Sequence, residues 1–250
     1  MYLRYPLVLF SLIVMLSGCT ASGEFDAGKA LGVGVGALQV AMLDEGTVKQ
    51  AASLSAKEMD VQNQVAGPDN LYSKRLLRMT EKLGRYDGLN LNFKVYLSED
   101  INAFAMADGT VRVYSGLMDV MPDDQVLAVI CHEIGHVKLQ HSYYQMKEAL
   151  LTNVAFDAVS TMGGTVGDLT SSQLGKLAQS AVHARFSQKD ELEADAYAVW
   201  TLHKMGDDPY AMKRSIETLQ QGGGSGGSFL SSHPSNRQRI DQIQSVINRL

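Results

Sequence analysis

The stretch Cys131-His132-Glu133-Ile134-Gly135-His136 places two histidines and a glutamate within five residues of one another. The preceding residues predict a helix, because Pro122 suits a first turn and apolar residues recur between 126 and 130. His132 and His136 then lie one turn apart and point to the same side. In this HExxH pattern the histidines bind zinc and the glutamate acts as a general base. So short a pattern also arises by chance, so the assignment requires a third ligand elsewhere in the chain.

Length and composition describe an ordinary globular protein. The chain has 250 residues, of which 45% are hydrophobic and 20% are charged, enough for one good-sized core domain. The formal net charge is -5 and the pI is about 5.7, and no dense cluster of lysine and arginine occurs. A nucleic-acid partner would require a basic patch, so we expect no nucleic-acid binding.

The N-terminus predicts an exported, lipid-anchored protein. Arg4 precedes an apolar run at 7–16, which is too short to span a bilayer of roughly 30 Å and is typical of a signal peptide. Leu16-Ser17-Gly18-Cys19 resembles the lipobox of bacterial lipoproteins, which implies cleavage before Cys19 and a lipid on that cysteine. Thr20 then favours the outer membrane over the inner one. The alternative is a simple secretory signal with an incidental cysteine. We expect a signal peptide at 1–18 and a lipidated N-terminus and tether at 19–43.

The remaining chain predicts a mostly helical α+β fold. Strands are expected at 91–97, 102–107 and 110–114, the last two joined by a turn at Asp108-Gly109. Because they directly precede the motif, we expect a small antiparallel sheet packed against the HExxH helix. A glycine tract at 222–227 interrupts the C-terminal part. Helices are expected at 44–65, 70–83, 139–162, 171–186, 187–205, 210–219 and 233–250.

Several residues are candidates for the third metal ligand. A metzincin pattern is excluded, because Leu139 stands where its glycine should be and Ser142 where its third histidine should be. Glu191 and Asp195 lie four residues apart on one helix face, so one can bind metal while the other orients a ligand. A solvated acidic helix start is the alternative. Cys131 points away from His132 round the helix and is expected to be a buried small hydrophobe. The candidates are His141, His183, Glu191, Glu193, His203 and His233.

A family resemblance selects among these candidates. Glu191-Leu192-Glu193-Ala194-Asp195-Ala196 resembles the ExxxD element of the HtpX and CAAX-prenyl-protease family of gluzincin metallopeptidases, in its periplasmic lipoprotein branch. Asn102-Ala103-Phe104-Ala105, the run 113–117, and His233-Pro234 followed by Arg239 also resemble family elements. The resemblance covers roughly residues 45–250, so we expect a zinc metallopeptidase domain with a zincin-like core at 44–250. It implies one Zn²⁺ per chain bound by His132, His136 and Glu191, with Asp195 in support and Glu133 as general base.

The resemblance also implies roles for residues around the metal. The strand of Asn102, Ala103, Phe104 and Ala105 is expected to hold an extended substrate. His233 and Arg239 are expected near the active site, where His233 either stabilises the oxyanion or occupies the open metal position. The other histidines, His141, His183 and His203, are expected to be structural or exposed.

The expected function is a zinc endopeptidase anchored to the outer membrane and facing the periplasm. Its expected substrates are unfolded or misfolded envelope proteins, as in protein quality control. Expected partners are the membrane itself, through the N-terminal lipid, and other periplasmic proteases or outer-membrane assembly factors. One alternative is a non-catalytic chaperone or adaptor, against which the intact Glu133 argues. Another is a zinc hydrolase such as a deformylase, which would need an upstream cysteine ligand that the mature chain lacks.

Overall fold

The computed structural model of the protein describes residues 43–152, 166–221 and 227–250. The expected signal peptide, the lipidation site Cys19 and the tether up to residue 42 lie outside these ranges. Residues 153–162 of one expected helix and residues 222–226 of the glycine tract also lie outside them. Within the described ranges, no helix is both long and apolar enough to cross a membrane.

The core of the domain is a three-stranded sheet made of β3 (Asn92–Tyr96), β4 (Ala103–Ala105) and β5 (Thr110–Tyr114), in the order β3-β5-β4. The turn at Asp108 and Gly109, where Gly109 has φ 91°, makes β4 and β5 antiparallel. β5 then inserts between β4 and β3 and runs parallel to β3. The α+β, mostly helical fold is confirmed. The sheet is mixed rather than wholly antiparallel, because β5 runs antiparallel to β4 and parallel to β3.

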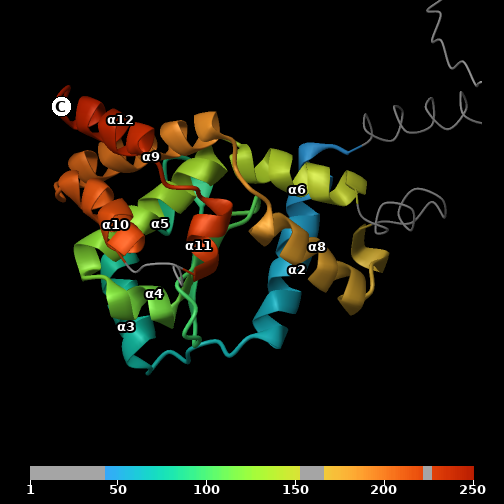
Figure 1. Cartoon of the computed structure of the whole chain (residues 1–250). Helices are drawn as coiled ribbons and strands as arrows, with labels where there is room; N and C mark the ends of the chain where they lie inside the picture. Colours follow the sequence, from blue (N-terminus) through green and yellow to red (C-terminus); the bar gives the residue numbers. More distant parts are fainter. Residues whose placement is uncertain (1–42, 153–165, 222–226) are drawn as a thin grey trace, which may run out of the picture. The chain divides into compact units, whose positions relative to one another are not determined.

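Helices cover both faces of this sheet (Figure 1). Alternate side chains face opposite ways, so Val95 and Val113 pack toward α5 while Tyr96 and Tyr114 pack toward α2. Asn92 and Lys94 share the strand face of Tyr96, yet α2 covers this face and buries the tyrosine ring. The α5 side contains α3 (Leu71–Thr80), α5 (Asp123–Lys138), α9 (Gln188–Met205), α10 (Tyr210–Gln221) and α12 (Arg237–Ile247). The other side contains α2 (Glu45–Gln62), α6 (His141–Thr152) and α8 (Ser171–His183).

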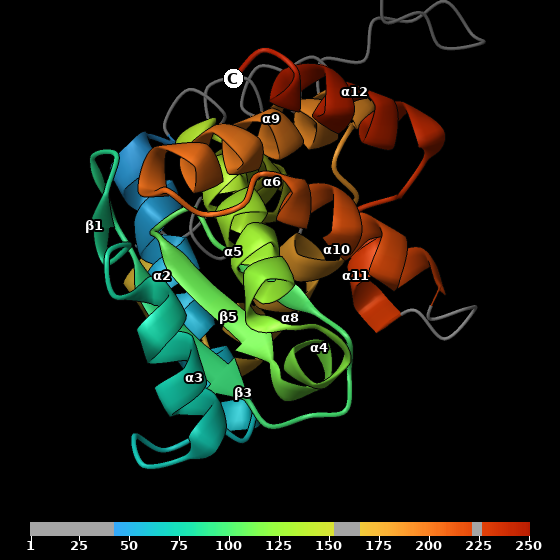
Figure 2. The ribbon, with the colours of Figure 1, turned by 90° about the vertical axis from the view of Figure 1, so that its left-hand side faces the viewer.

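The HExxH helix lies against the sheet as expected. Figure 2 shows α5 beside β5, with α3 alongside β3. Asn70 caps α3 by accepting a hydrogen bond from the Tyr72 amide, as the sequence predicted. The final helix differs from expectation, since Asn236 caps α12 and leaves His233 in the link before it. Short elements that the sequence did not predict are β1 (Arg85–Tyr86), β2 (Leu89–Asn90), α4 (Ser115–Val120), η1 (Val166–Asp168) and α11 (Gly227–Ser232).

Asp60 ties α2 to the sheet. Its carboxylate accepts hydrogen bonds from Nε and Nη2 of Arg112 at 2.8 and 3.0 Å. Lys94 Nζ and the Tyr96 hydroxyl donate to the same carboxylate at 2.7 and 2.8 Å. Burial alone would raise the pKa of Asp60, but these three donors hold it below its ordinary value. Arg112 is 2% exposed, so this carboxylate is the counter-charge that makes its burial tolerable.

Asp60→Ala should lower the free energy of unfolding by about 3 kcal/mol, because it leaves Arg112 buried without its partner. The folded pKa of Asp60 is lowered, so this stabilisation is present above about pH 4 and is lost as the pH falls through the folded pKa. Urea unfolding of variant and wild type across pH measures both effects. Asp69→Ala removes an exposed carboxylate 3.5 Å from Lys74 and should change nothing measurable. Equal losses in the two variants would contradict the role of Asp60.

Candidate metal centre

The HExxH residues come from the C-terminal half of α5. The helix begins directly after Pro122, and Asp123 and Asp124 occupy its first turn, where negative charge suits the helix dipole. Every residue from Gln125 to Val137 is buried. The two histidines and the glutamate are therefore held by packing on all sides of a core helix.

The two carboxylates come from the start of α9. The Ser187 hydroxyl accepts a hydrogen bond from the Asp190 amide at 3.2 Å, and the Asp190 carboxylate accepts one from the Ser187 amide at 3.1 Å. This capping box fixes where the helix begins. Glu191 consequently lies in the first turn and Asp195 one turn later, and both are buried. The alternative of a solvated acidic helix start is wrong for these two residues.

α5 and α9 meet in close backbone contact at Gly135. A Cβ added to Gly135 would lie 3.2 Å from both the Cα and the carbonyl oxygen of Ala194, and 3.2 Å from the Cβ of Tyr197. Because glycine has no side chain, the two helices approach more closely here than another residue would allow. The contact places the histidines of α5 opposite the carboxylates of α9.

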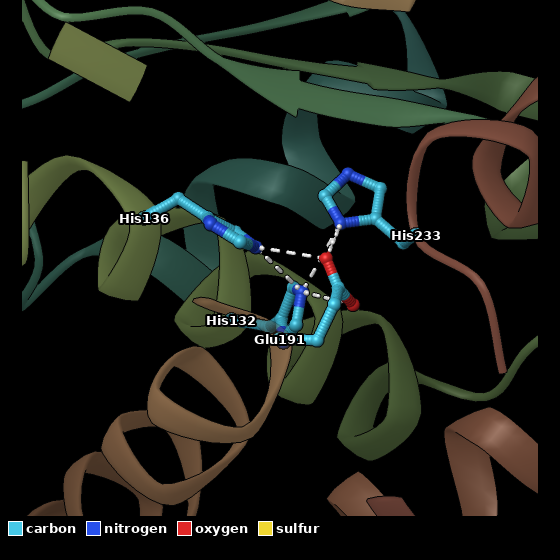
Figure 3. A group of neighbouring side chains, drawn as sticks. All are labelled: His132, His136, Glu191 and His233. Atoms are coloured by element: carbon cyan, nitrogen blue, oxygen red, sulfur yellow. Dashed lines mark hydrogen bonds and ion pairs between the residues drawn. The ribbon is translucent and has the colours of Figure 1, made fainter. Parts of the chain in front are cut away.

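Four side chains converge at this crossing: His132, His136, Glu191 and His233 (Figure 3). The Nε2 atom of His132 lies 3.0 Å from Nε2 of His136 and 3.3 Å from Nδ1 of His233. Glu191 Oε1 lies 2.9 Å from His233 Nδ1 and 3.5 Å from His136 Nε2, and its Oε2 lies 3.7 Å from His132 Nε2. The structure thus brings together the three predicted ligands and adds His233 as a fourth donor.

The donor atoms fit a tetrahedral metal ion. With zinc–ligand distances of about 2.0–2.1 Å, neighbouring ligand atoms of a tetrahedron lie about 3.3 Å apart. The five separations given above run from 2.9 to 3.7 Å, with Oε1 of Glu191 next to His136 and His233 and its Oε2 next to His132. The Nε2 atoms of His132 and His136 face each other at 3.0 Å, an arrangement that a shared cation explains. Two imidazoles and a carboxylate are also the donor types of catalytic zinc sites.

Asp195 and Arg239 hold the donors in place. Asp195 Oδ1 lies 2.9 Å from His132 Nδ1, which leaves Nε2 of His132 to face the metal position. Arg239 donates through Nε and Nη2 to Asp195, both at 2.7 Å, and pairs through Nη1 with Glu191. The same Nη1 donates to the carbonyl of His233 at 3.3 Å. One buried guanidinium thereby joins α9 to the His233 segment.

Burial and neighbouring charges set the protonation of the site. Burial holds the pKa of His136 well below its ordinary value, so the ring is neutral, as a metal ligand must be. Burial alone would raise the pKa of Glu191, but His233, His136 and His132 hold it well below its ordinary value. Burial raises the pKa of Glu133, and His233 and His132 only partly oppose this. Glu133 is therefore a carboxylate with increased proton affinity beside the donors, which suits a general base.

Of the other predicted residues, some lie beside the donor cluster and others lie away from it. Phe104 and Ala105 line a small cavity of about 10 Å³ that Glu133 and His233 also line. Asn102 is buried, and its side chain accepts a hydrogen bond from the Ala103 amide at 3.0 Å. The middle of the predicted substrate strand thus reaches the site. His183 and His203 are exposed, and Cys131 is buried in the core as expected.

Two further residues contact the predicted metal ligand His136. The ring of Phe186 stacks on it, with centroids 3.7 Å apart. His141 Nδ1 lies 3.1 Å from His136 Nδ1. The only sequence signal for His141 is its position five residues after His136, just beyond the expected helix motif. Phe186 has no such signal, because it lies in the link between α8 and α9, whose path depends on tertiary packing.

Several known proteins are similar in sequence to this chain over most of its length. Residues 71–247 match the model of peptidase family M48. The chain is 39% identical over 246 residues to the metalloprotease LoiP of Escherichia coli K12, covering 98% of this chain and 96% of that protein. It is 38% identical over 243 residues to the metalloprotease YcaL of the same organism, covering 96% of each. It is also 28% identical over 234 residues to the beta-barrel assembly-enhancing protease of Yersinia pestis, covering 83% of this chain and 46% of that protein.

Fold and site together define a metalloendopeptidase with a zincin-like core, and a His-Glu cluster offers the donor atoms for a catalytic metal. The chain belongs to peptidase family M48, and the resemblance found in the sequence is confirmed.

Gly135→Ala should weaken metal binding, because the new Cβ pushes the backbone of α9 away by a few tenths of an ångström. Overpacking of this kind typically costs about 1–3 kcal/mol. We expect a lower free energy of unfolding and a larger zinc dissociation constant, measured by denaturant titration and chelator competition. Gly67→Ala is the matched control, since a Cβ there meets nothing within 4 Å. An unchanged zinc affinity in Gly135→Ala would show that the crossing does not set the ligand geometry.

Proposed function

We propose that the protein is a zinc-dependent endopeptidase that hydrolyses peptide bonds of envelope proteins. The observation that carries this is a buried carboxylate, Glu133, beside the converging donors His132, His136 and Glu191. The Oε1 atom of Glu133 is buried and accepts no hydrogen bond from the described residues. A structural metal site or a binding module has no use for so costly a group, whereas a hydrolytic site needs it.

The residues divide the chemistry among them. His132, His136 and Glu191 would hold a zinc ion, which when bound would supply Lewis acidity toward water and the scissile carbonyl. Glu133 takes the proton of the attacking water and passes it to the leaving nitrogen. Its raised pKa makes it a stronger base for this step. Asp195 and Arg239 fix the orientation of His132 and Glu191 and transfer no proton themselves.

β4 offers a position for an extended substrate. It forms one edge of the β3-β5-β4 sheet, and hydrogen bonds from Met106 to Thr110 and from Tyr114 to Asn102 point toward β5. Main-chain groups alternate in direction along such a strand, so those of Ala103 and Ala105 point away from β5. We propose that a peptide pairs with this edge and so places its scissile bond next to Glu133.

His233 occupies the position that water and substrate need. Its Nδ1 lies among the metal donors, and its Nε2 lies 3.4 Å from Oε1 of Glu133. The adjacent cavity of about 10 Å³ has room for about one water molecule and for no substrate side chain. Of the two roles expected for His233, this geometry favours occupation of the fourth metal position in a resting state. Substrate binding then requires His233 to withdraw.

We also propose that the enzyme acts at the periplasmic face of the outer membrane, anchored by a lipid on Cys19. The support is the Leu16-Ser17-Gly18-Cys19 sequence after an apolar run, followed by Thr20. One relative is named as a beta-barrel assembly-enhancing protease, which supports unfolded or misfolded envelope proteins as substrates. Outer-membrane assembly factors and other periplasmic proteases are the corresponding partners.

Glu133→Gln should keep one zinc per chain and lose activity by a factor of about 10² to 10⁴, because it removes the base and no metal ligand. The measurement pairs zinc content with cleavage of unfolded casein and of a peptide library, for wild type and variant. Cleavage by the variant at the wild-type rate would overturn the mechanism. If both bind zinc and neither cleaves, the chaperone or adaptor alternative replaces the peptidase.

His233→Ala should retain zinc through the three remaining ligands and cleave unfolded casein faster than wild type at saturating zinc, because the fourth position is then open to water. His203→Ala changes an exposed histidine and should leave the rate unaltered. If His233→Ala cleaves more slowly with its zinc content unchanged, His233 acts in oxyanion stabilisation instead.

A further inference from the structure

His141 reaches His136 because the chain breaks its helix between them. Residues five apart on one continuous helix are separated by about 140° around the axis and do not meet. Here α5 ends at Lys138, and Gln140 adopts φ 65°, a left-handed conformation uncommon for any residue other than glycine. The turn lets α6 begin at His141 with its side chain directed back to His136. The unusual backbone at Gln140 is thus what creates this contact.

Both ring nitrogens of His141 have partners. Its Nδ1 lies 3.1 Å from Nδ1 of His136, and its Nε2 lies 3.2 Å from Oε2 of Glu193 and 3.6 Å from Oδ1 of Asp190. The His141 side chain is 7% exposed, whereas that of Glu193 is 43% exposed. The histidine therefore lies between a buried metal ligand and a solvated acidic pair.

The positions of the protons follow from these contacts. His136 directs Nε2 at the other donors, so as a neutral metal ligand it must carry its proton on Nδ1. That N–H donates to Nδ1 of His141, which must then be an unprotonated acceptor. The proton of His141 therefore lies on Nε2 and is donated to Glu193. One tautomer of each ring satisfies every contact in the series.

We propose that His141 is a positioning residue for the metal ligand His136, itself oriented by Glu193 and Asp190. Phe186 stacks on the His136 ring and fixes its plane, with 23° between the two rings. The hydrogen bond to His141 fixes the remaining freedom, the rotation of the ring within that plane. His136 thereby gains the counterpart of what Asp195 provides for His132. The proposal rests on the proposed function only in taking His136 as a zinc ligand.

A second metal ion bound by His141, Asp190 and Glu193 is the competing interpretation, since these three side chains also lie together. A cation on Nε2 of His141 would move the proton of that ring to Nδ1. Two N–H groups would then face each other at 3.1 Å whenever His136 also binds metal. The tautomers thus favour a hydrogen-bonded series over a second cation.

Substitutions that mimic one nitrogen at a time test the proposal in the full chain. His141→Asn keeps an acceptor near the Nδ1 position, whereas His141→Gln reaches toward the Nε2 position and loses the contact with His136. His141→Ala removes both contacts, and Glu193→Gln weakens only the outer one. His183→Ala, at an exposed histidine, is the control. Each variant is measured for zinc dissociation constant by chelator competition, zinc equivalents per chain, and the visible spectrum of its cobalt-substituted form.

We expect His141→Ala and His141→Gln to weaken zinc binding by about 10- to 100-fold and to alter the cobalt spectrum. His141→Asn should recover part of the affinity, Glu193→Gln should show a smaller loss, and His183→Ala should match wild type. A residue that merely fills space would not favour Asn over Gln.

Two results would overturn the proposal while leaving the proposed function intact. The first is a zinc dissociation constant within about two-fold of wild type in His141→Ala or His141→Gln, in a chain that still cleaves casein. The second is two zinc equivalents in wild type and one in these variants, which would establish the second-cation interpretation. A wild-type chain that binds no zinc would instead overturn the proposed function and this proposal with it.

Discussion

The close contact between the backbones of Gly135 and Ala194 is the constraint on which the site depends. α5 carries His132, Glu133 and His136, and α9 carries the two carboxylates, so the separation of the helices sets the distances between these two groups. These side chains are buried and have little freedom to compensate for a change in that separation. Metal geometry is therefore determined by how two helices pack, and the sheet and outer helices support that packing.

The charges of the site form a second constraint. When Glu133 is ionised, three buried carboxylates (Glu133, Glu191 and Asp195) face one guanidinium, that of Arg239, which leaves an excess of two carboxylate charges over that cation. A divalent cation offsets this excess, whereas a site without one would have to accept protons. Arg239 thus offsets part of this negative charge and also holds α9 against the His233 segment. The same balance explains why Asp195 stays ionised in full burial: burial opposes ionisation, and Arg239 and His132 hold its pKa below the ordinary value.

Local signals predicted the parts of the structure that depend on local chemistry. The spacing of His132 and His136, the acidic pair Glu191 and Asp195, and the cap at Asn70 were all readable in the sequence, whereas the capping box of Ser187 was not predicted. Contacts between segments that lie far apart in the sequence could not be predicted from local signals. β5 inserts between β3 and β4, which no strand pattern reveals, and α2 buries Tyr96 on a face that looked polar. His141 reaches the site because the backbone of Gln140 is left-handed. Glutamine seldom adopts this conformation, so the sequence does not indicate the turn.

The order of the site residues along the chain determines when the metal site can form during synthesis. A chain that emerges N-terminus first exposes both histidines and Glu133 about fifty residues before Glu191, and Arg239 follows about fifty residues after Glu191. Metal affinity of a buried site arises with folding, so an incomplete chain has ligands without a site. The guanidinium of Arg239 joins α12 to α9 and completes the assembly. Until α12 has packed against α9, the carboxylates of α9 lack the buried counter-charge of Arg239, and the metal site is incomplete.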